Sequence, residues 1–525
     1  MERRINFYFD WFTHLSIVET PRIDNTYHWG DIWNFRNKPL FINDVNQLNA
    51  TTNRFKKIAD NIFPLQNGLP PQYFLDIFVN KKMNTYVYKE DYLMQPNTIN
   101  FTMLQEVFNR TELKKSKDYE YKLVGDTVEK NCYNWYLINM IAQENLVYPD
   151  PLSNIPVQTI KFIKDNDIKI MLWLSWEPFH FHTMGHTLLR VVQFCEHHEI
   201  PISNVYLQNC NLKSDYYKYK LWDIWRHSDN KLDEIYINLE AILDINIRPT
   251  NFFHWELFTR LKQDFDREDY FTSTVCKEQY IKDAFLVKRN KKFFLPIRNV
   301  KSHRVLLLTA LTKKGVIDDG YYSCIGIMEQ ILKVEDRNYL KKETVREIRD
   351  KCLSRVDYVE SFDITKTDIL RLLKKIPIFI NEYEGFRDGV DIDDRSILPQ
   401  VNDSYFTITF ETVVGDDTNL FITEKSYKPF FYMQPFIIIG EPHTLAYLRT
   451  KGYETFPEFF DESYDEIIDK NDRFSFCTEQ ILKLCEKDID ELHEMYISVK
   501  DKLIHNRRLF LSQNPKKEVK TWFKY

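Results

Sequence analysis

The sequence predicts an α/β protein with two Rossmann-like, doubly wound lobes that face each other across a cleft, together with helical additions. Short apolar segments alternate with helical ones over residues 159–245, and the alternation starts again after residue 292. This pattern is typical of parallel sheets covered by helices on both faces. The length of 525 residues is too great for one hydrophobic core.

Composition narrows the class of protein. Hydrophobic residues make up 43% and charged residues 28%, which indicates a folded, soluble chain. The net charge of −6 argues against a general nucleic-acid binder but leaves a local basic groove open. We find no apolar run long enough to span a bilayer, and no signal-peptide core at the start. The eight cysteines show no CxxC spacing, so we expect reduced thiols and a cytoplasmic protein.

The N-terminal lobe is assigned to residues 1–287 and is expected on the acceptor side. It opens with a strand at residues 5–10, with Asp10 near the carboxyl end. An irregular insertion is expected at about residues 21–154, containing one helix at 132–144. The regular part follows, with strands at 168–174, 205–207 and 235–237 and a helix at 185–198.

The C-terminal lobe is assigned to residues 288–480, because the basic junction at 288–292 separates the two alternating regions. A strand at 293–297 leads into a helix at 302–313, which Gly315 closes. Charged helices are expected over residues 335–375. Residues 481–525 are expected to form C-terminal helices and a basic tail, which holds Lys516, Lys517, Lys520 and Lys524.

Residues 406–440 are the most informative stretch. Alternating β-branched and aromatic residues predict a strand that ends at Phe410, and a polar loop follows. Thr423 could cap a helix that begins with Glu424 and Lys425, and Pro429 predicts that this helix is short or bent. A buried parallel strand is expected at 436–439. Ligands of such βαβ units bind at the carboxyl ends of the strands, where the Glu-Lys pair would lie.

Two groups of polar residues are candidates for binding. Arg298, Lys301 and Arg304 lie between a strand and the start of a helix, where charge and free N–H groups favour a diphosphate. The alternative for this segment is a solvated basic turn. Glu411 and Glu424 could accept sugar hydroxyls, and the lysine at 425 could neutralise phosphate. The alternative for this pair is an ordinary surface ion pair.

The two groups together resemble the donor-binding region of the α1,3/4-fucosyltransferase family. The family has a strand ending in Phe-Glu-Asn, a loop and Val/Ile-Thr-Glu-Lys; here the residues are Phe410-Glu411-Thr412 and Ile422-Thr423-Glu424-Lys425. The similarity covers about residues 290–475, and it resembles that expected of a divergent viral or microbial member of the family. It implies the GT-B arrangement of two lobes. It also implies inverting, metal-independent transfer of a sugar from a nucleotide-diphosphate sugar to a hydroxyl acceptor.

The resemblance also implies roles for single residues. Glu411 and Glu424 would contact the donor's sugar or ribose, while Lys425 and Arg304 would hold its diphosphate. Two positions depart from the family pattern. Thr412 stands where the family has Asn, and Phe421 stands where it often has an aromatic hydroxyl. The donor therefore need not be GDP-fucose.

Glu177 is the candidate general base, because an inverting transfer needs a carboxylate to take the acceptor proton. It follows a buried strand in a loop that weakly resembles the family's acceptor-side loop, and Asp10 is the second candidate. The alternative for Glu177 is a solvated loop carboxylate. His180, His182 and His186 favour packing or acceptor contacts over zinc, and the DxD at 391–393 is interpreted as solvated. No essential metal is expected, and the only cofactor would be the nucleotide-sugar donor.

Three functions stay open at this point. The first is transfer to a glycan or another hydroxyl acceptor. The second is transfer to a modified, hydroxymethylated base in DNA, with the basic residues 288–292, Arg507, Arg508 and the lysine tail along one groove. The third is a non-catalytic binding or structural protein on the same scaffold. Salt-dependent binding to DNA would distinguish the second function from the first.

Overall fold

The computed structural model describes ten stretches of the chain, which form two compact units. Unit 1 comprises residues 1–252 and 514–525, and unit 2 comprises residues 253–513. The described residues are 3–9, 119–139, 157–174, 181–213, 239–251, 278–326, 342–380, 394–415, 419–512 and 515–525, together with Leu152, Ile155, His254 and Leu257.

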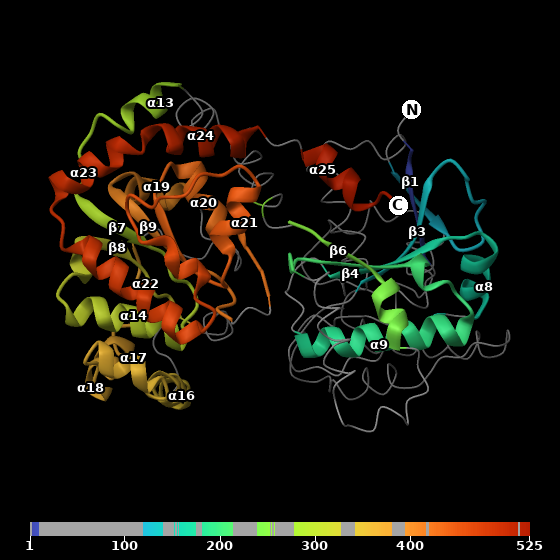
Figure 1. Cartoon of the computed structure of the whole chain (residues 1–525), viewed down its shortest axis with the longest axis horizontal. Coiled ribbons are helices and arrows are strands. Elements are labelled where there is room, and N and C mark those ends of the chain that lie inside the picture. The colour runs from blue at the N-terminus through green and yellow to red at the C-terminus, as the bar shows by residue number, and fades with distance from the viewer. Residues whose placement is uncertain are drawn as a thin grey trace, which may run out of the picture. The chain divides into compact units, whose positions relative to one another are not determined.

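Unit 1 contains a six-stranded sheet in the order β2-β1-β3-β4-β5-β6, in which every neighbouring pair is parallel (Figure 1). The first strand therefore lies between the second and the third, and the strand order reverses there. The strands are β1 (Ile5–Phe9), β2 (Tyr119–Leu123), β3 (Tyr133–Asn139), β4 (Lys169–Leu174), β5 (Val205–Asn209) and β6 (Asn246–Pro249).

The helix predicted at residues 132–144 is wrong, because β3 occupies most of this segment. Trp135, Tyr136, Leu137 and Ile138 are all buried, on both faces of the sheet. A strand buried on both faces loses the alternation of apolar and polar residues that reveals a strand in a sequence. Residues 119–139 thus belong to the sheet and not to an irregular insertion, whereas residues 21–118 lie outside the described part.

Helices cover one face of this sheet and the end of the chain packs on the other (Figure 1). The helix α9 begins at Phe181, ahead of its predicted start at Gly185. On the opposite face the Trp135 indole donates to the Phe523 carbonyl at 2.9 Å. The elements are α8 (Val157–Asp165), α9 (Phe181–His198), η2 (Ile202–Asn204) and η4 (Leu239–Asp244), with α25 (Pro515–Trp522) from the end of the chain.

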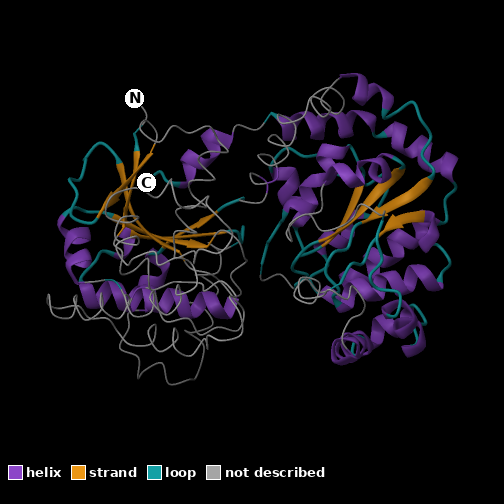
Figure 2. Ribbon diagram, turned by 180° about the vertical axis from the view of Figure 1, so that it is seen from behind, coloured by secondary structure: helices purple, strands orange, loops and turns teal. Residues whose placement is uncertain are grey.

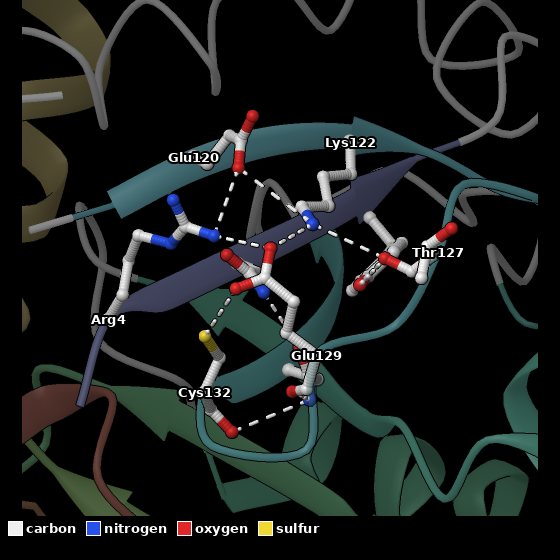
Figure 3. Close-up of polar contacts among 9 residues, drawn as sticks. Arg4, Glu120, Lys122, Thr127, Glu129 and Cys132 are labelled. Carbon is white, nitrogen blue, oxygen red and sulfur yellow. Dashed lines mark hydrogen bonds and ion pairs between the residues drawn. The ribbon is translucent and has the colours of Figure 1, made fainter. Parts of the chain in front are cut away.

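A short crossing segment joins β2 to β3 and carries a charged cluster (Figure 3). The Glu129 carboxylate accepts from Arg4 and, at 2.7 Å, from the Lys122 ammonium. The hydrogen bond from Lys122 lowers the pKa of Glu129. The hydroxyl of Tyr8, on β1, donates to the Thr127 carbonyl at 3.3 Å. These contacts fasten the crossing segment over β1, so they have a structural role.

Unit 2 contains a four-stranded parallel sheet in the order β10-β9-β7-β8, with helices on both faces (Figure 2). It is therefore doubly wound, as the alternating pattern predicts. The strands are β7 (Lys291–Leu295), β8 (Gly320–Tyr322), β9 (Ser404–Phe410) and β10 (Phe436–Ile439). The helices are α13 (Glu278–Asp283), α14 (Ser302–Lys313), η5 (Ile317–Asp319), α16 (Lys342–Leu353), α17 (Val356–Ser361), α18 (Lys366–Leu373), α19 (Asp394–Asn402), α20 (Glu424–Tyr432), α21 (Thr444–Thr450), η6 (Glu462–Glu466), α22 (Lys470–Cys485), α23 (Ile489–Ser498) and α24 (Lys500–Leu511).

Most elements predicted for this unit are confirmed. The helix α14 has its predicted bounds, and Gly315 follows it with a φ of 74°. Thr423 caps α20 by accepting from the Lys425 N–H. Pro429 lies inside α20, which is a short helix as expected. The strand β10 is buried and parallel to β9.

The chain divides before the predicted junction at Lys288–Lys292, since unit 2 begins at residue 253. The predicted C-terminal helices separate as well: α23 and α24 belong to unit 2, and α25 belongs to unit 1. The strand predicted at residues 235–237 lies outside the described part. Within that part, no helix combines the length and the apolar character needed to cross a membrane.

Candidate anion site in unit 2

The predicted donor-binding residues meet at the carboxyl ends of β7 and β9. The chain runs from β7 outward to β8 on one side, while β9 and β10 lie on the other side of β7. The strand order therefore reverses between β7 and β9. In open α/β sheets this reversal point is where ligands bind. The connection from β7 to α14 and the connection from β9 to α20 both begin there.

Glu411 is the first residue after β9, and it is fully buried. Its carboxylate accepts from the Thr423 N–H at 3.0 Å, from the Thr423 hydroxyl at 2.7 Å and from the Thr412 N–H at 3.2 Å. The hydroxyl of Ser426 donates to it as well. With four donors around it and no exposed surface, this carboxylate fixes the start of α20 to the end of β9. The geometry therefore supports positioning by Glu411, in place of the direct donor contact that the resemblance implies.

Lys425, in the first turn of α20, and Lys301, the residue before α14, approach the same residue, Thr412. The Lys301 ammonium donates to the Thr412 carbonyl at 2.9 Å. The Lys425 ammonium lies 3.4 Å from the Thr412 hydroxyl and 3.1 Å from the Thr423 hydroxyl. It also forms an ion pair with Glu424 at 2.9 Å. The residue that departs from the family pattern thus lies between two ammonium groups.

Arg304 is in the first turn of α14 and only 5% exposed. Its guanidinium donates to the carbonyls of Asn299 at 2.9 Å and Glu411 at 3.4 Å, while its Nε has no hydrogen-bond partner. No carboxylate of the described residues lies within ion-pair distance of it. Burial lowers the pKa of Arg304 to about 10, so it stays charged at neutral pH. The neighbouring His303 is neutral there, because burial holds its pKa well below the usual range.

The remaining donor-site predictions differ in outcome. Arg298 lies half-buried in the connection that leads to α14. Glu424 is partly exposed and paired with Lys425. The Phe421 side chain is only 2% exposed, and its N–H donates to the Glu441 carboxylate at 2.8 Å. Phe421 is therefore a packing residue, and its missing hydroxyl need not affect a ligand directly.

Sequence reasoning missed Ser426 and Glu441. Ser426 follows the Glu-Lys pair directly, but its contact with Glu411 depends on how α20 returns to β9. Glu441 comes immediately after β10 and its closing Gly440, and it is buried. A carboxylate directly after an apolar strand is a recognisable signal of a group at the carboxyl edge of a sheet. It was available in the sequence at this position.

Most of the predicted catalytic and metal-related residues fall outside the part of the chain that the structure describes. Glu177, Asp10, His180 and the DxD at 391–393 are outside the described residues. His182 lies inside α9 and not before it, because the helix begins at Phe181. Across the described stretches, no three His, Cys, Asp or Glu side chains are grouped so that they could hold a metal ion.

Two of the basic residues proposed to line a DNA groove are buried. Arg507 is 1% exposed and packs over the Phe431 ring at 4.7 Å. Arg289 is also buried, where it donates to the Ser404 carbonyl. Lys288 pairs with Asp490 at 2.6 Å. The lysine tail belongs to unit 1, whereas residues 288–292 and 507 belong to unit 2.

Comparisons of the chain with protein-family models, with curated proteins and with solved structures give no match.

Proposed function

We propose that unit 2 binds the diphosphate of a nucleotide sugar, and that the chain is a glycosyltransferase acting on a hydroxyl acceptor such as a glycan. The observation that carries this proposal is the buried guanidinium of Arg304 at the reversal point of the sheet. The resemblance of residues 290–475 to the α1,3/4-fucosyltransferase family supports the choice of a nucleotide sugar.

A buried charge is costly unless an opposite charge or several hydrogen bonds compensate for it. Arg304 has two carbonyl partners and, among the described residues, no ion pair. A bound anion would supply the missing counter-charge and a partner for its Nε. Because the guanidinium is held by backbone carbonyls at both Nη atoms, its direction is fixed before the ligand arrives.

Lys301 and Lys425 add two positive charges at the end of β9, where both contact Thr412. Together with Arg304 they would balance the charge that develops on a leaving diphosphate. Three cations in one place favour a mechanism without an essential metal. Glu411 would not touch the donor in this mechanism; it would keep Lys425 in position by fixing the start of α20.

The acceptor half of the proposal rests on unit 1. Two units with parallel sheets are compatible with a GT-B arrangement, in which the acceptor lobe supplies the general base. Glu177, with Asp10 as the second candidate, stays the proposed base. Inversion at the sugar carbon follows from this role, since one carboxylate would remove the acceptor proton while the diphosphate leaves.

A panel of nucleotide sugars tests the proposal, scored by donor turnover and by thermal shift. Wild type is expected to turn over at least one donor. Lys425→Ala should weaken the binding of that donor roughly tenfold or more, because a charge-assisted contact with its diphosphate is lost. Lys351→Ala is the matched control, since Lys351 also forms a Lys-Glu pair, at 2.8 Å with Glu347, but on α16. Binding of no donor, or equal binding by Lys425→Ala and wild type, would overturn the proposal.

A further inference from the structure

A second set of polar side chains lies at the carboxyl end of β5 in unit 1. Gln208 and Asn209 are the last two residues of this strand and are fully buried. The strand lies between β4 and β6, and Gln208 is in register with Trp173 and Arg248. This position is at the edge of the sheet where parallel α/β sheets bind ligands.

The amides of these two residues have unused hydrogen-bonding groups. Neither Oε1 nor Nε2 of Gln208 has a partner, and Nδ2 of Asn209 has none either. In the part of the chain that the structure describes, Gln208 is the only side chain with both polar atoms in this state. Buried polar groups in native proteins nearly always have a hydrogen-bond partner, so two such atoms without one need an explanation.

Asn204, the last residue of η2 and the residue directly before β5, shows the ordinary arrangement. Its Oδ1 accepts from Lys169 at 2.5 Å, and its Nδ2 donates to the Asp167 carboxylate at 2.9 Å. Both amide atoms are thus satisfied within the protein. The difference between the two ends of β5 is therefore a property of the carboxyl end, and not of buried amides in this unit generally.

The chemistry of an amide restricts what could satisfy Gln208. A phosphate or carboxylate could accept from its Nε2 but could not donate to its Oε1, and a metal ion would leave Nε2 unpaired. A hydroxyl group can both donate and accept. The nearest cation in the register, Arg248, donates to the carbonyls of Trp522 and Lys524 and lies over the Tyr206 ring at 4.4 Å. The site is therefore suited to an uncharged ligand.

We propose that the carboxyl end of β5 binds an uncharged, hydroxyl-rich ligand, a saccharide, through the amides of Gln208 and Asn209. The inference rests on the proposed function in that it names the class of acceptor. Tyr206 lies two residues before Gln208 and so on the same face of the strand, but its ring is already packed against Arg248 and Trp135. The amides alone would therefore hold the ligand, since an amide both donates to and accepts from the hydroxyls of a sugar.

The test uses the full chain and a panel of lactose, chitobiose and maltose, with affinity measured by calorimetry and stability by thermal unfolding. Wild type is expected to bind at least one of them. Gln208→Met keeps the length of the side chain and removes both polar atoms. It should lose at least tenfold in affinity while the melting temperature without ligand is unchanged or higher, because an unpaired buried group has been removed.

Two further variants keep the test decisive. Asn209→Ser replaces the carboxamide by a hydroxyl, whose oxygen can still accept from the Asn211 N–H that now donates to Asn209 at 2.7 Å. The unpartnered NH₂ is removed with the carbonyl carbon, and the variant should also weaken saccharide binding. Asn204→Ala should lower the melting temperature and leave the affinity unchanged. The inference is overturned if no saccharide of the panel binds wild type, or if both Gln208→Met and Asn209→Ser bind as wild type does.

Binding of GDP and UDP, measured on the same preparations, separates this inference from the proposed function. If a nucleoside diphosphate binds and no saccharide does, the saccharide site is wrong and the donor proposal stands. If a saccharide binds through Gln208 and no nucleoside diphosphate binds, the donor proposal is wrong and the saccharide site stands.

Discussion

The carboxyl edges of the two sheets share a topology and differ in their chemistry. In both sheets the first strand lies between the second and the third, so the strand order reverses at the same place. In unit 2 this edge carries Arg304, Lys301 and Lys425, whose positions are fixed by carbonyls and hydroxyls. In unit 1 the end of β5 carries the uncharged amides of Gln208 and Asn209, and neither polar atom of the Gln208 amide has a hydrogen-bond partner.

The site in unit 2 lies at this reversal, whereas the end of β5 in unit 1 lies two strands beyond β3 and so away from it. What the two places share is the carboxyl edge of a parallel sheet, and the side chains at that edge decide the class of ligand. Fixed cations around a buried guanidinium suit an anion, because positive charge is already in place and Arg304 has no ion pair among the described residues, although Lys425 pairs with Glu424. Unpartnered amides suit a ligand that both donates and accepts. A glycosyltransferase needs both kinds of site, one for the diphosphate of the donor and one for the hydroxyls of the acceptor.

The largest expected loss of stability concerns Glu411, which fixes the carboxyl edge of the sheet in unit 2. Glu411→Ala leaves the N–H and hydroxyl of Thr423 and the hydroxyl of Ser426 without their buried acceptor. We expect the free energy of unfolding to fall by roughly 3–5 kcal/mol, since hydrogen bonds to a buried charge are lost together. Urea denaturation measures the change.

Glu424→Ala is the matched control for this prediction. Glu424 is the neighbouring glutamate implied by the same resemblance, but it is partly exposed and has an ion pair with Lys425 at 2.9 Å. Its replacement should cost about 1 kcal/mol or less, as is usual for exposed ion pairs. Equal stabilities of the two variants would show that Glu411 does not hold this edge together.

A smaller effect concerns His254, a buried side chain in unit 2. Its Nε2 lies 2.8 Å from the Tyr453 hydroxyl, and burial lowers its pKa to about 3. The unfolded chain takes up a proton near pH 6.5 while the folded protein does not, so this group's contribution to stability falls as the pH drops from 6.5 towards 3. From this group alone we expect about 2 kcal/mol less stability at pH 5 than at pH 7.

His254→Phe should remove that part of the pH dependence, as measured by urea denaturation at both pH values. If His254→Phe keeps the slope of wild type, the acid sensitivity has another source than His254.

Local signals predicted much of unit 2. The helix α14 and the cap of α20 follow from a basic turn, a closing glycine and Thr423, all of which act within a few residues. The strand β3 could not be predicted in the same way. Its residues are apolar on both faces because helices cover one face of the sheet and the end of the chain packs on the other. The strands β1 and β4, between which it pairs, and the end of the chain are far away in the sequence.

The candidate anion site was predictable as a set of residues but not as a set of roles. Arg304, Lys301 and Lys425 were singled out from charge and position at helix starts. That Glu411 faces Thr423 and Ser426 depends on α20 folding back against β9, which no local pattern contains. The same holds for Gln208, since an unpaired amide is visible only once its surroundings are known.

Calorimetric titration of wild type and Arg304→Met with GDP and UDP tests the central claim most directly. Wild type should bind a nucleoside diphosphate, and Arg304→Met should bind it roughly 10–100-fold more weakly. Without ligand the variant should differ from wild type by no more than about 1 kcal/mol, because relief from burying the charge offsets the two lost hydrogen bonds to the carbonyls of Asn299 and Glu411. Lys313→Met, at the far end of α14 where Lys313 pairs with Asp363 at 3.0 Å, should keep wild-type affinity. Equal affinity of Arg304→Met and wild type would contradict an anion site at this edge.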